Sequence, residues 1–261
     1  MCKLMPMSTV LPIYMYHYIR PFSDPFYESH LSLPPKVLGT QIRWFKSAGF
    51  AFLTLGQSWS RIVGGESHPK AVCLTFDDVD QEFMRNALPV LEEEKVPATL
   101  FVIAGTLSGV ELFNVSERMK PLPPCRLRDM VEKGHEIGCH GMTHRELSGL
   151  PEADLQHELV DSRRLLMKVT GSAVDSFAYP RGGFDDGVME AAKEAGYTCA
   201  CTTLRGNTQD PTDRYRLHRI RLGKRHTGAR LRYTTTPLYH RCKQRRRRRD
   251  RLRMAGREAE G

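Results

Sequence analysis

The stretch AVCLTFDD, residues 71–78, decides how the rest of this chain is interpreted. An apolar run rich in β-forming residues ends in two carboxylates, which is typical of a buried strand that delivers acids to a site at its C-terminal end. Neighbouring residues of a strand point to opposite faces, so Asp77 and Asp78 can share one site only if the backbone turns there. One acid could then bind a metal while the other moves protons. The simpler interpretation is that both acids cap a turn or a following helix.

A second stretch, GHEIGCHGMTH at residues 134–144, changes that balance. It places His140 and His144 four positions apart, a spacing at which neutral imidazoles can converge on one ion. Two histidines and one carboxylate leave a coordination position open for water or substrate, which is the pattern of a catalytic rather than a structural zinc. The two stretches together therefore favour a metal site over a turn cap.

These residues resemble a known family. The segment 75–78 followed by His140-x-x-x-His144 is similar to the first two motifs of the polysaccharide deacetylases, carbohydrate esterase family 4. VPATLFV at 96–102 resembles the second strand of that family, and FAYP at 177–180 resembles its third motif in the form found in poly-N-acetylglucosamine deacetylase-like members. The resemblance runs from about residue 10 to about residue 222.

The resemblance implies a fold and an activity. The fold is a distorted (β/α) barrel in a single domain over residues 10–222, after a leader at 1–9. The activity is that of a metal-dependent hydrolase that removes N-acetyl groups from an N-acetylated sugar or glycan. The metal is Zn²⁺ or another divalent transition metal, with Asp78, His140 and His144 as its ligands. Asp77 is then the general base that takes a proton from the attacking water.

The general acid has two candidates in the sequence. MYH at residues 15–17 resembles the opening strand of the poly-N-acetylglucosamine deacetylase-like members, in which the strand order is rotated and the histidine reaches the site. The ordinary family pattern would use His218 instead. We favour His17, because members of the rotated kind often lack a histidine at the position of His218. The structural alternative for His17 is a partly buried histidine paired with backbone.

Three residues depart from the common family pattern. Ala178 stands where many deacetylases have arginine, a feature shared with the poly-N-acetylglucosamine-type members. Arg181 stands where an aromatic residue is usual, and a long cation at the mouth of the site would favour an anionic sugar. Gly141 replaces the usual Ser or Thr, so a hydroxyl is missing from the loop that shapes the ligands.

The apolar pattern along the chain agrees with this fold class. Strand patterns at 10–19, 98–103, 135–139, 176–179 and 197–203 alternate with helical patterns, which favours a parallel α/β sheet or barrel. Active sites in such barrels lie at the C-terminal ends of the strands. A helix is predicted over 80–94, with Pro89 kinking it or lying near one end.

Composition limits the location and the cysteine chemistry. No apolar run approaches the roughly 20 residues needed to span a bilayer, and the N-terminus lacks a signal-peptide pattern. We therefore expect a cytoplasmic protein; export from a different start site is the alternative. Seven cysteines, several in apolar runs and with no second pair to complete a zinc cage, are expected to be reduced core residues.

The positive charge is concentrated at the C-terminus. Residues 241–261 hold ten Lys or Arg and three acids, so +7 of the net +9 lies there. The sequence predicts a basic, disordered tail from residue 223, because periodicity is poor and five consecutive arginines repel one another. Its candidate partner is an anionic membrane surface or nucleic acid, and the alternative is a solvated end without a partner.

Two other functions fit the same residues. A site of this kind could hydrolyse a non-polymeric amide, as an amidase or deformylase does. A barrel without activity could bind carbohydrate only. Because Asp77, Asp78, His140 and His144 are all present, the sequence favours the glycan deacetylase.

Overall fold

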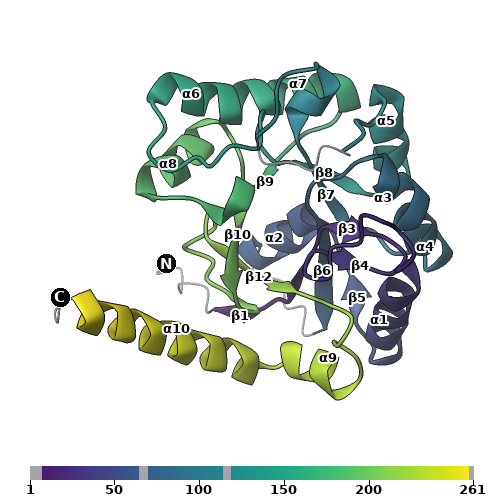
Figure 1. The fold of residues 1–261 in the computed structure, drawn as a ribbon, viewed down its shortest axis with the longest axis vertical. Coiled ribbons are helices and arrows are strands. Elements are labelled where there is room, and N and C mark those ends of the chain that lie inside the picture. Colours follow the sequence, from purple (N-terminus) through teal and green to yellow (C-terminus); the bar gives the residue numbers. More distant parts are fainter. Residues whose placement is uncertain (1–7, 65–69, 114–118, 259–261) are drawn as a thin grey trace.

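A computed structural model describes residues 8–64, 70–113 and 119–258. Residues 1–7, which make up most of the predicted leader, lie outside the described residues. Strands occupy the centre of the molecule and helices surround them (Figure 1).

Seven parallel strands close into a barrel, in the order β2, β12, β10, β9, β8, β7 and β6, with β6 pairing back to β2 (Figure 1). Their bounds are β2 Ile13–Tyr16, β6 Ala71–Phe76, β7 Thr99–Val102, β8 Glu136–Cys139, β9 Ser176–Ala178, β10 Cys199–Arg205 and β12 Leu217–Arg221. Each of these pairings is parallel. The predicted (β/α) barrel is therefore confirmed.

Shorter strands flank the barrel. β5 (Ala51–Phe52) pairs with the start of β6, β1 (Thr9–Val10) with β11 (Thr208–Gln209), and β3 (Tyr18–Ile19) with β4 (Ser32–Leu33). The helices are α1 Pro35–Ser47, α2 Leu55–Val63, α3 Gln81–Asn86, α4 Leu88–Glu93, α5 Pro124–Glu132, α6 Glu152–Gln156, α7 Ser162–Thr170, α8 Asp186–Glu194, α9 Ala229–Thr234 and α10 Pro237–Glu258. A π-helical turn, His157–Asp161, joins α6 to α7, and 3₁₀ turns form at Ala104–Leu107 and Pro180–Gly182.

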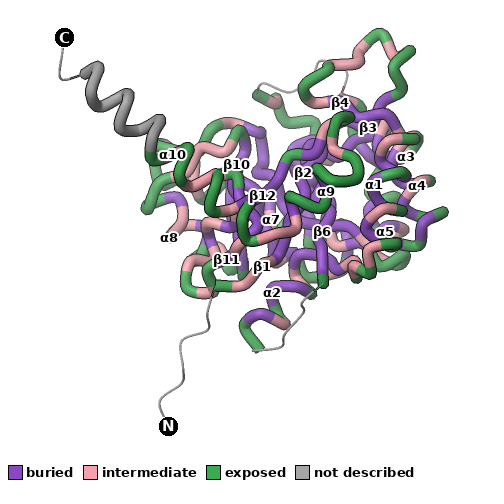
Figure 2. Tube along the Cα trace, turned by 90° about the horizontal axis from the view of Figure 1, so that it is seen from below, coloured by how far each residue is buried: buried purple, intermediate pink, exposed green. Residues whose placement is uncertain are grey.

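Strand β6 is buried along its whole length and alternates between two cores. Ala71 and Cys73 belong to the cluster inside the barrel, whereas Val72, Leu74 and Phe76 belong to the larger cluster between strands and helices. This period of two is what a strand buried on both faces requires. Figure 2 shows the result, a buried centre of strands with exposed residues on the outer segments.

Helix α2 closes the N-terminal end of the barrel. Its Leu55, Trp59 and Ile62 side chains belong to the inner cluster. The Leu55 N–H donates to the hydroxyl of Thr99, the first residue of β7, at 2.8 Å. Because this end is filled, the opposite end, where the strands reach their C-termini, is left for the site.

Two predicted elements are interrupted by proline. The strand predicted over 10–19 is divided into β1, β2 and β3, and Pro12, which has no N–H to donate, lies between the first two. The helix predicted over 80–94 is broken at Ala87, so that Pro89 lies in the first turn of α4. The prediction that Pro89 kinks the helix or lies near an end is confirmed.

The C-terminal segment differs from the sequence-based expectation. The tail was expected to begin at residue 223, but α9 and the start of α10 pack against the barrel, with Leu231 and Tyr239 buried. The buried Asn207 side chain donates to the carbonyls of Thr234 and Thr236, both at 2.8 Å. Few side chains make this contact and the rest of α10 is polar, which explains why the sequence shows no clear periodicity there.

Six described cysteines are free; Cys73, Cys139, Cys199 and Cys201 are buried, as expected of core residues, whereas Cys125 and Cys242 are exposed, so the expectation was wrong for these two. Among the described helices, none has the length and apolar character needed to cross a bilayer.

Candidate active site

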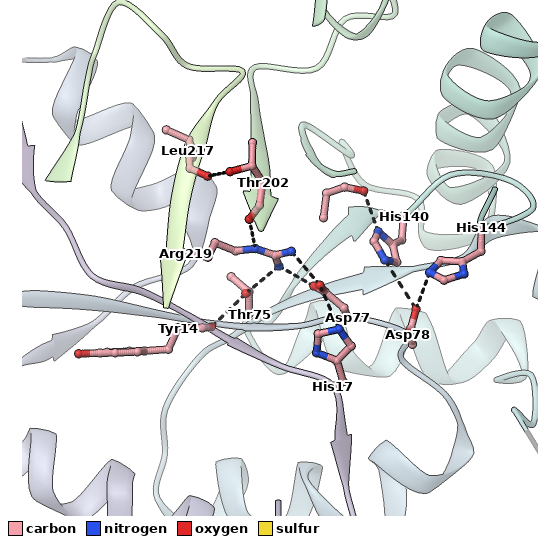
Figure 3. A network of polar contacts seen from close by, with 11 residues as sticks. Tyr14, His17, Thr75, Asp77, Asp78, His140, His144, Thr202, Leu217 and Arg219 are labelled. Atoms are coloured by element: carbon pink, nitrogen blue, oxygen red, sulfur yellow. Dashed lines mark hydrogen bonds and ion pairs between the residues drawn. The ribbon is translucent and has the colours of Figure 1, made fainter. Parts of the chain in front are cut away.

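The predicted site residues come together at the C-terminal end of the barrel (Figure 3). Asp77 and Asp78 follow β6, His140 follows β8, and His17 follows β2. Because all these strands are parallel, their C-terminal ends meet at one edge. With His144 from the loop after β8, these residues line a cavity of about 310 Å³, which we call the metal cavity.

A backbone turn lets both aspartates serve this cavity. Asp77 continues the inward-facing phase of Ala71 and Cys73 along β6. Asp78 then adopts φ 55°, a left-handed conformation that costs on the order of 1–3 kcal/mol in a residue other than glycine. The turn that the sequence required for a shared site is present.

Asp78, His140 and His144 form a group that could hold a metal ion. One ligand atom from each lies within 4.8 Å of the others, and all three side chains are buried. Asp78 Oδ1 lies 3.6 Å from His140 Nε2 and 3.4 Å from His144 Nε2 and has no hydrogen-bond partner among the described residues. A buried carboxylate oxygen without a hydrogen bond is costly unless a cation satisfies it. The residues therefore fit a metal with two nitrogen ligands and one oxygen ligand.

The outer ring nitrogens of both histidines are already engaged. His140 Nδ1 lies 2.7 Å from the Ala178 carbonyl and His144 Nδ1 lies 3.0 Å from the Phe113 carbonyl. A carbonyl only accepts, so each Nδ1 carries a proton, and when the ring is neutral its Nε2 presents a lone pair toward Asp78. Burial lowers the pKa of His140 to about 4, against the opposing influence of Asp77 and Asp78. His140 is therefore neutral at physiological pH, as a metal ligand must be.

Asp77 is held by an arginine that the sequence analysis missed. Arg219 Nη1 donates to Asp77 Oδ1 at 2.6 Å and Nη2 donates to Oδ2 at 2.8 Å (Figure 3). The same guanidinium donates to the Thr202 carbonyl at 2.9 Å and to the Thr75 hydroxyl at 3.3 Å. Arg219 comes from β12, two residues after the inward-facing Leu217, so strand phase was the signal that could have revealed it.

This arginine sets the protonation state of Asp77. Burial alone would raise the pKa of Asp77, but Arg219, helped by His140 and His17, lowers it to about 2. Asp77 is therefore ionised at neutral pH and can accept a proton. The cation beside this acid comes from β12 and not from position 178, which is alanine.

The structure separates the two candidate general acids. His17 lines the metal cavity, and its Nε2 lies 4.0 Å from Asp77 Oδ2. His218 points away from the cavity, toward α10, where its ring contacts His240 at 5.1 Å between centroids and its Nε2 lies 3.4 Å from Gln244. Geometry therefore favours His17, which was the preferred candidate.

The loop that carries the histidines is anchored by a second missed residue, Glu158. Its buried carboxylate accepts hydrogen bonds from the backbone of Met142 at 2.8 Å and of Thr143 at 3.1 Å, and another from the Thr143 hydroxyl. Glu158 lies in the π-helical turn, a feature that is frequent at functional sites. A Cβ on Gly141 would meet Glu158 Oε2 at 2.8 Å, and Gly141 has φ 78°. Glycine is therefore required here, and Glu158 organises the loop without the usual hydroxyl.

Left-handed residues concentrate at the site. Asp78, His144 and Arg181 are three of the four described residues other than glycine with positive φ, and all three line the metal cavity. Such strain persists only where surrounding structure enforces it, and it is frequent at active sites. The exposed Arg181 lies at the mouth, where the sequence placed a cation.

The geometry defines a class: a parallel barrel with a candidate metal triad and an adjacent ionised acid at the C-terminal ends of its strands. The sequence model of the family Polysaccharide deacetylase matches residues 64–200, just over half of the chain. The chain therefore belongs to the polysaccharide deacetylase family, whose members hydrolyse the N-acetyl amide bonds of glycans.

Three comparisons illustrate the relationship. The Bacillus subtilis (strain 168) protein YxkH, which carries the name of a polysaccharide deacetylase, is 29% identical over 84% of this chain and 74% of its own length. A Staphylococcus aureus poly-β-1,6-N-acetyl-D-glucosamine N-deacetylase is 30% identical over 60% of this chain, and the match spans 56% of that protein. The structure of the Streptococcus pyogenes deacetylase PplD in complex with acetate superposes with a TM-score of 0.79 and 25% identity, over 89% of this chain and all of that one. The resemblance inferred from the motifs is confirmed.

Proposed function

We propose that this chain is a metal-dependent N-deacetylase that acts on an N-acetylglucosamine-containing glycan. One observation carries the proposal: Asp78 Oδ1, buried without a hydrogen bond, lies 3.6 Å from His140 Nε2 and 3.4 Å from His144 Nε2, with ionised Asp77 adjacent. The name of the Staphylococcus aureus relative supports N-acetylglucosamine as the sugar.

The residues divide the chemistry. A divalent metal held by Asp78, His140 and His144 would polarise the acetamide carbonyl and lower the pKa of a bound water. Asp77 is ionised and takes the proton of the attacking water, as a general base. His17, whose Nε2 lies 4.0 Å from Asp77 Oδ2, gives a proton to the departing sugar amine.

Arg219 acts through Asp77. Its two hydrogen bonds fix the plane of the carboxylate, and its charge keeps that carboxylate ionised inside the barrel. A pKa of about 2 makes Asp77 a weaker base than one tuned near neutral pH, so its orientation has to supply part of the rate.

Metal content and acetate release test this proposal together. We expect near-stoichiometric metal in the purified full chain and acetate release from N-acetylglucosamine oligomers. Asp77→Asn should keep the metal and lose at least about 100-fold in kcat, the range typical of general-base catalysis. His140→Ala should lose the metal. Asp129→Asn and His157→Ala, which change outer positions on α5 and the π-helical turn, are the matched controls.

Other outcomes would overturn parts of the proposal. A wild-type protein without metal would contradict the assignment of Asp78, His140 and His144. Bound metal with hydrolysis of small acyl amides, but not of N-acetylated sugars, would indicate the amidase or deformylase. Bound metal without hydrolysis of any amide would indicate a carbohydrate-binding barrel.

A further inference from the structure

A second cavity adjoins the metal cavity. It has a volume of about 500 Å³ and shares five lining residues with the metal cavity: Met15, His17, Leu31, Arg205 and Arg221. Because these residues line both spaces, the two cavities lie next to each other at the C-terminal face of the barrel. A ligand whose reacting group sits at the metal can therefore extend into the second cavity.

Four cations line this second cavity, which we call the basic pocket: Arg205, Arg221, Arg230 and Lys243. No Asp or Glu is among its described lining residues. Within the described part of the chain, none of the four forms an ion pair, whereas Arg43, Arg163 and Arg219 each pair with a carboxylate. Burial lowers the pKa of Lys243, and the charges of Arg205 and Arg246 lower it further. The cations thus repel one another without an internal counter-charge.

Four separate elements bring these cations together. Arg205 ends β10, Arg221 ends β12, Arg230 belongs to α9 and Lys243 to α10. Their convergence therefore depends on the C-terminal segment packing on the barrel, which Tyr239 and Leu231 secure by burial.

The wall of the basic pocket is built by a buried polar side chain. Gln41 is fully buried and donates to the carbonyls of Gly223 at 3.2 Å and His226 at 3.1 Å. Its own carbonyl accepts from the Tyr16 hydroxyl at 3.0 Å. Gln41 thereby fixes the loop that connects β12 to α9, and Gly223, His226 and Tyr16 all line the pocket. A surface of solvated arginines would not need such a support.

We propose that the basic pocket is an anion-binding subsite next to the metal cavity, and that the substrate is an N-acetylated glycan bearing a phosphate or carboxylate group near the sugar that loses its acetyl group. This inference rests on the proposed function for the reaction itself. The subsite further predicts that the substrate carries a negative charge. Arg181, which also lines the metal cavity, adds a further cation beside the reaction site. A nucleic acid is less favoured, because these cations line a concavity that adjoins the metal cavity.

Paired substrates test the subsite. Acetate release is compared for a neutral N-acetylglucosamine tetramer, the same tetramer with a reducing-end phosphate, and a tetramer of matched length containing one uronic acid. In the metal-loaded wild type, we expect kcat/KM to be about tenfold higher or more for at least one charged tetramer, mainly through a lower KM, since hydrogen bonds to charged groups are the strong ones. The charged tetramer with the larger increase in kcat/KM shows whether the subsite prefers phosphate or carboxylate.

Variants locate the effect. In Arg230→Gln/Lys243→Gln, the ratio of kcat/KM for charged over neutral tetramers should fall toward one. Arg128→Gln, an exposed arginine on α5 that lines none of the described cavities, should keep the wild-type ratio. Equal kcat/KM for neutral and charged tetramers in the wild type would overturn the proposal.

A binding measurement separates this proposal from the proposed function. A fluorescent phosphorylated tetramer should bind the metal-loaded Asp77→Asn protein more tightly than the neutral tetramer does, and the double variant should remove this preference. If no glycan releases acetate but this binding preference is found, the proposed function fails and the subsite stands. Binding of an oligonucleotide but of no charged tetramer would overturn the glycan subsite in favour of a nucleic-acid surface.

Discussion

Both oxygens of Asp77 are held by the guanidinium of Arg219, at 2.6 and 2.8 Å, and both side chains are buried. A buried pair of this kind is costly to break, because the partner that remains is an uncompensated charge. Both residues also line the metal cavity. The Arg219 guanidinium lies over the Phe101 ring, 5.7 Å from its centroid. One contact therefore affects folding and catalysis together.

Arg219→Lys should separate charge from geometry. Lysine keeps the positive charge but cannot hold both carboxylate oxygens in one plane. We expect kcat to fall about 10- to 100-fold with KM little changed, because a misplaced base affects the reaction more than substrate binding. The measurement is kcat and KM for acetate release from a neutral tetramer.

Arg219→Gln should in addition change the pH profile. Without the arginine, burial is less opposed and the pKa of Asp77 rises, so the acidic limb of kcat/KM should move to higher pH. We also expect a loss of about 3 kcal/mol or more in the free energy of unfolding. An unmoved acidic limb would show that Arg219 supports only the fold.

The sequence predicted the site residues at the ends of β6 and β8, but not the residues from other elements that contact them. Asp77, Asp78, His140 and His144 lie in two short stretches, so local spacing was enough to group them. Arg219 was missed because its partner is far away in the sequence, and only strand phase relates the two. Glu158 was missed because it accepts from Met142 and Thr143, which belong to a different element, so no local spacing relates them.

The C-terminal segment was predicted least well. Arginine content suggested self-repulsion, whereas a few buried contacts, such as Leu231 and Tyr239, hold α9 and α10 against the barrel. Tertiary packing of so few residues produces no periodic pattern in the sequence. The basic pocket exists only because of that packing, so the sequence could indicate a cation at Arg181 but not a second cavity.

Glu158→Gln tests how the histidine loop is held. The carboxylate accepts from two backbone N–H groups and one hydroxyl, and glutamine loses the charge and replaces one acceptor with a donor. We expect a loss of about 2 kcal/mol in the free energy of unfolding and a 10- to 100-fold loss in metal affinity. Glu152→Gln, an exposed acid at the start of α6, is the control. Unchanged metal affinity would contradict the role given to Glu158.

Gly141→Ser would restore the residue usual in the family and should nevertheless weaken this protein. Gly141 and Gly109 have similar positive φ values, 78° and 70°, but a Cβ at Gly141 meets Glu158 at 2.8 Å whereas a Cβ at Gly109 meets nothing within 4 Å. Backbone strain is therefore matched and only the clash differs. We expect Gly141→Ser to lower Tm by several degrees more than Gly109→Ser, and to lower metal affinity when Gly109→Ser does not. Equal effects of the two variants would show that the contact with Glu158 is unimportant.

Acid should loosen the C-terminal segment through His218. Burial lowers the pKa of His218 to about 4, and the charges of His240, Arg247 and Arg216 add to the effect. In the unfolded chain the imidazole takes up a proton near pH 6.5, so this contribution to stability is complete above about pH 6.5 and is lost as the pH falls toward 4. His218→Gln, which keeps a polar group beside Gln244, removes the titration. Measured on metal-free protein, the fall in Tm of His218→Gln between pH 7 and pH 4.5 should be about 3 °C smaller than that of wild type. If the Tm of His218→Gln falls as much as the Tm of wild type, acid acts on other groups.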